Sequence, residues 1–251
     1  MSFNTSIRQS TIADSYVQTL LAGQRADARQ IVEDCLNCGV SPAELLTKLI
    51  WPVMEQIQSL YKADSINRIT LNLATRLNRS VADQVSGKLE QQPKNGKKVI
   101  LLCGDDEPEE LGGQVVADLF EADGYDVRFA GGGVPNDEIL SMIGDFRPDL
   151  LVLFATRAPG VPQARKLIDY LREVNSCPDM QIMCCGGIYK RAEGLAEEIG
   201  ADLYAPDAAE ALSCAKSHST RRATVDQQTV GRSRRIKKAA QRKTDVTARA
   251  A

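Results

Sequence analysis

The stretch VILLC, residues 99–103, is a short and wholly apolar run that follows the polar segment QQPKNGK, residues 91–97. A run of this length without polar alternation is typical of a strand buried on both faces of a parallel sheet. Comparable apolar runs occur at 149–154 and 181–185. Residues 99–103 therefore mark the start of an α/β domain, and the proline and glycine in 91–97 indicate the linker before it.

Beyond the first strand, short strands alternate with helical segments. Further strands are expected at 126–130 and 203–205, and helices at 113–122, 136–146, 161–175 and 191–199. This alternation predicts βαβ units, and hence a parallel sheet with helices on both faces. In such sheets ligands bind beyond the carboxyl ends of the strands. Here those ends are the glycine- or proline-containing loops 104–113, 131–135, 155–162 and 186–189.

The residues before the linker carry helical periodicity. Four helices are expected, at 15–22, 26–38, 41–60 and 67–89. The third begins with a capping box, Ser41-Pro42-Ala43-Glu44, and Pro52 should kink it midway. The predicted fold class is α/β, with an N-terminal helical bundle as a cap, a flavodoxin-like (Rossmann-type) parallel-sheet domain, and a disordered basic C-terminal tail. The predicted boundaries are 12–90 for the cap, 98–215 for the sheet domain and 216–251 for the tail.

The formal net charge of -2 conceals a strong asymmetry. From Lys216 onward the chain has eleven basic and two acidic residues, whereas the rest is acidic. The segment 221–243 indicates an arm for nucleic acid or another acidic partner, and the alternative is a solvated tail that aids solubility. Sequence-specific DNA recognition is not expected, because no helix-turn-helix or zinc module accompanies the tail.

The composition bounds the remaining classes. Among 251 residues, 43% are hydrophobic and 25% charged, as in a soluble globular protein. No apolar run approaches the ~20 residues of a membrane span, and the first fourteen residues do not form a secretory signal. The seven cysteines are therefore expected to be reduced, in a cytoplasmic protein without a membrane partner. Cys35 and Cys38 form a C-x-x-C for which packing is favoured over metal or redox use.

Several catalytic classes find no support in the residues. The only histidine, His218, lies beyond the sheet domain, which excludes histidine-dependent triads from the folded part. Asp105 and Asp106 after the first strand suggest a receiver domain, but no aspartate ends the third strand, so loop residues that cap the next helix are favoured. Cys184 and Cys185 lack an evident base, and core packing is the default for both.

Three motifs follow the strand ends in register. The loop after the first strand contains Glu107-Pro108-Glu109-Glu110-Leu111-Gly112, and the third strand ends in Phe154-Ala155-Thr156. Gly186-Gly187 follows the fourth strand, with Gly200-Ala201-Asp202 after it. With the helical cap, these motifs resemble the cobalamin-binding modules of methionine synthase, of corrinoid proteins in methyltransferase systems, and of CarH-type light-sensing repressors. The resemblance covers roughly residues 16–212.

The resemblance assigns roles to the first loop, where the family has D/E-x-H-x-x-G. Glu107 takes the acidic position that would orient the histidine, and Gly112 would let the backbone approach the ligand tail. Glu109 takes the position of the histidine itself. A carboxylate is a harder donor than imidazole and a poor match for a corrin-bound cobalt. The resemblance therefore implies a cobalamin site without a histidine lower ligand.

The other motifs also depart from the family pattern. Phe154 and Thr156 stand where the family often has S-x-L near the nucleotide tail, so a hydroxyl donor is lost and a ring is gained. Gly186 and Gly187 would allow close backbone contact with a flat ligand.

Light-sensing relatives have a tryptophan and a Glu-His pair in the cap. The tryptophan position corresponds to Tyr61, and the Glu-His positions correspond to Leu71 and Asn72. Trp51, the only tryptophan, is interpreted as a core residue.

The resemblance favours a non-catalytic regulatory or sensor module, not an enzyme, that binds cobalamin base-on between cap and sheet, with a protein partner or a second copy at the cap. Two alternatives remain open: a ligand-free interaction scaffold whose tail contacts nucleic acid, and a corrinoid carrier in methyl transfer, against which the absent histidine argues. No protein metal ligand and no catalytic residue is predicted. The candidate cofactor-binding residues are Glu107, Glu109, Gly112, Phe154, Thr156, Gly186, Gly187, Tyr61 and Asn72.

Overall fold

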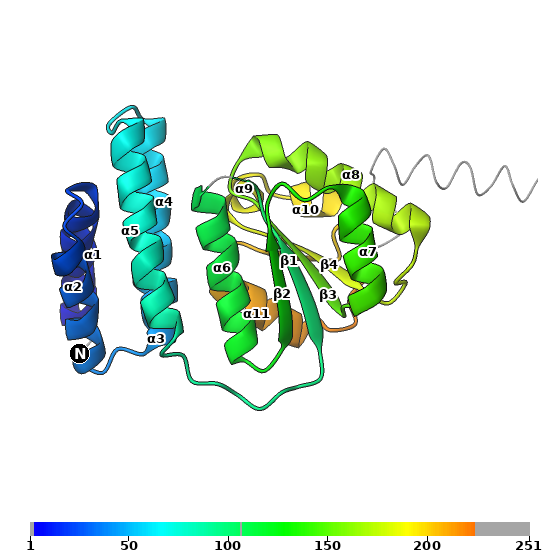
Figure 1. Cartoon of the computed structure of the whole chain (residues 1–251), viewed down its shortest axis with the longest axis horizontal. Helices are drawn as coiled ribbons and strands as arrows, with labels where there is room; N and C mark the ends of the chain where they lie inside the picture. Colours follow the sequence, from blue (N-terminus) through cyan, green and yellow to red (C-terminus); the bar gives the residue numbers. More distant parts are fainter. Residues whose placement is uncertain (1–2, 106, 224–251) are drawn as a thin grey trace, which may run out of the picture.

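The computed structural model describes residues 3–105 and 107–223. A helical cap packs against the helices that cover one side of a five-stranded parallel sheet, and further helices cover the opposite side (Figure 1). The cap consists of α1 (Phe3–Leu21), α2 (Arg25–Asn37), α3 (Pro42–Leu45), η1 (Leu46–Ile50), α4 (Trp51–Lys62) and α5 (Arg68–Ser86). The predicted fold class is thus confirmed, and the first helix begins well before the predicted residue 15.

The third predicted helix is continuous but irregular. Its capping box is present, because the Glu44 amide donates to Ser41 Oγ at 3.2 Å and the Ser41 amide donates to Glu44 Oε2 at 3.4 Å. The expected kink at Pro52 takes the form of a π-helical turn, η1, just before this residue. Proline has no N–H for the carbonyl one turn earlier, and a local π turn accommodates that missing bond.

The sheet has the order β2-β1-β3-β4-β5, and all its pairs are parallel. The strands are β1 (Lys98–Leu102), β2 (Asp126–Gly131), β3 (Leu150–Phe154), β4 (Gln181–Cys185) and β5 (Leu203–Ala205). Each lies within about one residue of its predicted position. β2 lies on one side of β1 and β3 on the other. The strand order therefore reverses between β1 and β3, and doubly wound sheets bind their ligands at such a switch point.

The helices of the sheet domain differ more from the predictions. They are α6 (Glu107–Ala122), α7 (Asn136–Phe146), η2 (Ala158–Gly160), α8 (Val161–Val174), α9 (Gly187–Arg191), α10 (Leu195–Glu198) and α11 (Ala208–Ser217). The predicted loop 104–113 is wrong in its second half, because α6 starts at Glu107 and absorbs the acidic motif. The helix predicted at 191–199 is two short helices, and α11 was not predicted.

The two faces of the sheet belong to two hydrophobic cores. Alternate residues of β1 point to opposite sides: Val99 and Leu101 join the core beneath α6, α11 and the cap, whereas Ile100 and Leu102 join the core beneath α7 and α8. The cap helices share the first core with the sheet. Cap and sheet domain therefore form one packed body, with α5 lying alongside α6 (Figure 1).

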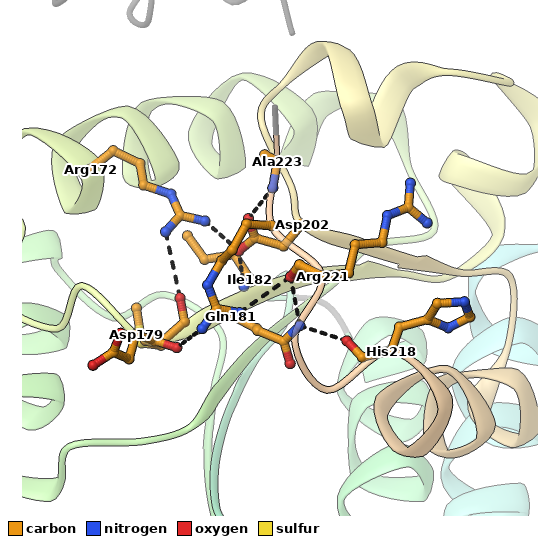
Figure 2. A network of polar contacts seen from close by, with 10 residues as sticks. Arg172, Asp179, Gln181, Ile182, Asp202, His218, Arg221 and Ala223 are labelled. Atoms are coloured by element: carbon orange, nitrogen blue, oxygen red, sulfur yellow. Dashed lines mark hydrogen bonds and ion pairs between the residues drawn. The ribbon is translucent and has the colours of Figure 1, made fainter. Parts of the chain in front are cut away.

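The chain after α11 is held at the amino ends of β4 and β5 (Figure 2). The Gln181 side-chain amide donates to the backbone carbonyls of His218 at 2.9 Å and Arg221 at 2.7 Å. The Ala223 amide donates to Asp202 Oδ1 at 2.6 Å. The folded part therefore continues to residue 223, past the predicted boundary at residue 215. The predicted disorder and acidic partners of 221–243 fall mostly on 224–251, outside the described residues.

Candidate ligand-binding site

A cavity of about 370 Å³ lies beyond the carboxyl ends of β1 and β3, against α7 and α8. Its volume is at the lower end of the range for small-molecule sites. Its position agrees with the expectation that ligands bind at the carboxyl ends of the strands. Its walls come from β1 and its loop, the loops after β2 and β3, and the first turns of α7 and α8. Its lining residues include Gly104, Glu109, Gly131, Gly133, Phe154, Arg157 and Ala164.

Glu109 is buried at the rim of this cavity, with 4% of its surface exposed. Its Oε1 accepts hydrogen bonds from the Thr156 amide at 2.6 Å, the Thr156 hydroxyl at 2.9 Å and the Arg157 amide at 2.9 Å. On the other side its Oε2 presses against Gly104, where an added Cβ would lie 1.6 Å away. The carboxylate thus bridges the ends of β1 and β3, and Gly104 must lack a side chain to admit it.

The loop after β3 is also held from the side of α9. The Arg191 guanidinium donates to the Thr156 carbonyl. An added Cβ on Gly187 would lie 3.0 Å from this guanidinium and 3.5 Å from Oε1 of Glu55, a residue of α4. Thr156 is therefore fixed by Glu109 on one side and by Arg191 on the other, and the cap comes close to this rim.

Phe154 occupies the space that Gly112 was expected to leave for a ligand. A Cβ on Gly112 would meet the tip of the Phe154 ring at 2.3 Å. The same ring packs edge-to-face on Trp51, with 5.6 Å between centroids and 78° between the ring planes. Both aromatic residues are buried, which agrees with the interpretation of Trp51 as a core residue. The role predicted for Gly112 is corrected: this glycine accommodates the protein's own aromatic ring.

A substitution of Gly112 tests this packing. Gly112→Ala is expected to lower the free energy of unfolding by about 1–3 kcal/mol, because the new methyl group forces Phe154 out of place. Gly144→Ala is the matched control: this glycine also lies within a helix, and nothing lies within 4 Å of its added Cβ. The control should gain about 0.5–1 kcal/mol from helix propensity. Urea denaturation of both variants measures the difference, and equal effects would contradict the packing role.

Gly186 and Gly187 also serve the protein's own packing. Gly186 has φ = 113°, which favours glycine, and its added Cβ would lie 2.4 Å from the Ala155 carbonyl oxygen. Gly187 is limited by Arg191, as described above. Contact of either glycine with a flat ligand stays a prediction.

The cap residues predicted for the site lie away from the cavity. Tyr61 and Asn72 do not line it. Asn72 is exposed on α5. The Arg68 guanidinium lies over the Tyr61 ring, 5.8 Å from the ring centroid, in a cation–π contact. Leu71, at the family's acidic position, is buried in the cap core. The Glu107 side chain lies outside the described residues, although its backbone begins α6.

The structure adds residues that sequence reasoning missed. The Arg157 amide, in the β3 loop, donates to Glu109, and Arg191 donates to the Thr156 carbonyl. Gly160 of η2 and Ala164 of α8 also line the cavity. The position of Arg157 directly after the predicted third strand is a signal that could have indicated its place. Arg191 and Ala164 give no comparable signal, because only the packing of helices on the sheet brings them to the rim.

The cysteine and membrane predictions can be compared with the structure. Burial raises the pKa of the Cys184 thiol to about 12, and it raises that of Cys185 strongly as well. Both thiols stay protonated at neutral pH, which fits a packing role.

Among the described residues, no three His, Cys, Asp or Glu side chains lie close enough together to hold a metal ion. Every helix within residues 3–105 and 107–223 falls short of the length and apolarity of a bilayer-spanning segment.

A helical cap on a 2-1-3-4-5 parallel sheet, with a cavity at its switch point, defines a two-part ligand-binding class of α/β protein. Two family models, each described as a B12 binding domain, match residues 97–213 and 12–85. Together they span the cap and the sheet domain. The chain belongs to the B12-binding domain family, which confirms the resemblance seen in its sequence.

Known relatives extend over most of the chain. Monomethylamine corrinoid protein 1 of Methanosarcina acetivorans is 24% identical over 210 residues, covering 81% of this chain and 95% of that protein. Monomethylamine corrinoid protein 2 of Methanosarcina mazei is 24% identical over 196 residues, covering 76% and 89%. The solved structure of the Methanosarcina barkeri monomethylamine corrinoid protein has a TM-score of 0.71 at 22% identity, covering 81% and 96%. These names agree with the prediction that the chain is not itself an enzyme.

The residues at the rim fit a corrinoid in part. The cavity and its glycines at 131 and 133 leave room beyond the strand ends for part of such a ligand. The position of the imidazole ligand does not fit, because Glu109 is turned into the β3 loop and already accepts three hydrogen bonds there. A corrinoid at this edge would therefore receive no nitrogen ligand from this position.

Proposed function

We propose that this protein is a non-catalytic corrinoid-binding protein of the carrier type, which holds its cofactor at the carboxyl edge of the sheet and presents it to a protein partner. The observation that carries the proposal is the 370 Å³ cavity at the switch point between β1 and β3. Family membership and relatives named as corrinoid proteins support it. A bound corrinoid supplies a cobalt atom able to carry a methyl group.

Particular residues would hold such a cofactor. Gly131 and Gly133 would let the backbone approach it, and the apolar wall formed by Leu153 and Leu167 would exclude water from it. The cavity mouth also includes Arg157, whose charge suits an anionic group of the ligand. The protein's contribution is thus shape and exclusion of water, with no predicted acid–base chemistry.

A regulatory role is the second candidate. It is favoured by one observation: cap and sheet share a continuous core, and Trp51 of the cap packs on Phe154, which lines the cavity, so that a ligand that moved Phe154 would also disturb the cap. Such a ligand would favour one arrangement of cap and sheet over another and could change self-association. The relatives named as corrinoid proteins make the carrier role the better supported of the two.

Gel filtration with hydroxocobalamin tests the proposal. The wild-type chain is expected to co-elute with the visible absorbance of the corrinoid. Ala164→Phe, which fills the cavity from α8, should reduce the retained corrinoid about tenfold, equivalent to about 1.4 kcal/mol. Lys166→Phe introduces the same side chain at an exposed position of α8 and is the control. Absence of any retained colour in the wild type would refute corrinoid binding.

A further inference from the structure

The carboxylate of Glu109 closes the gap between Gly104, after β1, and residues 155–157, after β3. We call this gap the β1–β3 crevice. Three hydrogen bonds, from the amides of Thr156 and Arg157 and from the Thr156 hydroxyl, hold the carboxylate on the β3 side. The absence of a side chain at Gly104 lets the carboxylate lie against β1. The crevice is therefore filled by a side chain of the protein.

Glu109 is poorly suited to leave this place. Only 4% of its surface is exposed, and its Oε1 accepts hydrogen bonds from two backbone N–H groups and one hydroxyl. If the carboxylate turned toward a metal, these donors would lose their acceptor in a buried site, which is unfavourable. The cobalt of a corrinoid also prefers a nitrogen ligand to a carboxylate oxygen.

The surroundings reinforce the closure. Arg191 holds the Thr156 carbonyl, so that the β3 loop cannot yield without breaking contacts with α9. The Phe154 ring fills the space beside Gly112 on the α6 side. The glycines that would admit a displaced nucleotide base into the crevice thus accommodate Glu109 and Phe154.

We infer that the ligand is a complete cobamide whose own base remains on the cobalt, because Glu109 plugs the crevice and supplies no metal ligand. This inference rests on the proposed corrinoid binding and names the ligand form. Glu109 is then a positioning residue: it fixes the β3 loop at the rim of the cavity. A corrinoid without an appended base would leave the cobalt without a nitrogen ligand and would lose the contacts of that base.

Two commercial probes separate the possibilities: hydroxocobalamin, which carries a base, and aquocobinamide, which lacks one. The wild-type protein should retain cobalamin at least about tenfold more tightly than cobinamide. After reduction to the cobalt(II) state, the electron paramagnetic resonance spectrum should show coupling to one nitrogen, unchanged in ¹⁵N-labelled protein. A labelled spectrum that changes, a base-off spectrum, or equal retention of the two probes would overturn the inference while corrinoid binding stood. Retention of neither probe would overturn both.

Variants at position 109 test whether the Glu109 side chain in the β1–β3 crevice determines the coordination of the cobalt. Glu109→Ala should open the crevice to the displaced base, so that bound cobalt(II) cobalamin loses its nitrogen coupling, and it should speed amide hydrogen exchange in 150–160. Glu109→Gln keeps an acceptor and a similar shape, so it guards against a folding defect and should behave closer to the wild type. Glu110→Gln is the control, since its carboxylate pairs with Arg79 at 3.1 Å on the cap side. Nitrogen coupling that is retained in Glu109→Ala, as in Glu110→Gln, would contradict the role of Glu109 in closing the crevice.

Discussion

Replacement of Asp202 by alanine is expected to lower the free energy of unfolding by about 3–5 kcal/mol, the effect of removing one partner of a buried ion pair. The Asp202 side chain is 1% exposed and pairs with the Arg172 guanidinium, which is 19% exposed. Its Oδ2 also accepts from the Ile182 amide at 2.8 Å, and its Oδ1 accepts from the Ala223 amide at 2.6 Å (Figure 2). Alanine would leave the largely buried Arg172 cation without its carboxylate, and two backbone donors without an acceptor.

Chemical denaturation of the full chain measures this effect. Asp179→Ala is the control, because Asp179 is exposed and contributes only its backbone carbonyl to the contact with Arg222. That substitution should change the free energy of unfolding by no more than about 0.5 kcal/mol. The removal of Asp202 should also increase proteolysis after Arg221 and Arg222, since the segment loses its anchor. A loss smaller than about 1 kcal/mol would show that the anchor contributes little.

The second large effect is expected at Trp51. Trp51→Ala should lower the free energy of unfolding by about 3–5 kcal/mol, because the indole is 4% exposed where the cap meets the end of β3. Its edge-to-face contact with Phe154 is a direct link between cap and sheet. A double-mutant cycle with Phe154→Leu should give a coupling energy of about 0.5–1.5 kcal/mol.

The cycle distinguishes a specific contact from general loss of core volume. Trp51→Phe, which keeps an aromatic ring, should retain most of the stability and part of the coupling. Thermal unfolding followed by far-ultraviolet circular dichroism is sufficient, since cap and sheet share one core and should unfold together. Strict additivity of Trp51→Ala and Phe154→Leu would contradict a direct link between the two rings.

Most strands could be predicted closely because they are short apolar runs between turn residues. The run at 181–185 is strand β4 with the predicted bounds, and 203–205 is β5. Helix starts were harder. The acidic segment after β1 contains Pro108, which suits the first turn of a helix as well as it suits a loop, and α6 therefore begins earlier than expected. The helix α11 was missed because its alanine-rich segment carries only a weak apolar stripe.

The candidate site was predicted at the correct edge of the sheet, but the cavity lies against α7 and α8 and not between cap and sheet as expected. Sequence spacing put Glu109 and Thr156 at neighbouring strand ends, where the structure brings them into contact. Spacing could not show that the carboxylate turns toward the β3 loop, because side-chain direction depends on partners far apart in sequence. For the same reason, Gly112 was assigned to a ligand although its neighbour is Phe154. The cap positions Tyr61 and Asn72 depend on how two helices dock, which periodicity alone does not define.

The attachment of the segment after α11 has a practical consequence. Asp202 and Gln181 hold it at the amino ends of β4 and β5, whereas the cavity opens beyond the carboxyl ends of the strands. A five-residue strand separates these rims by roughly 16 Å. A fluorescent label or a surface tether joined to residue 223 would therefore sit on the far side of the molecule and leave the cavity mouth clear for a binding assay.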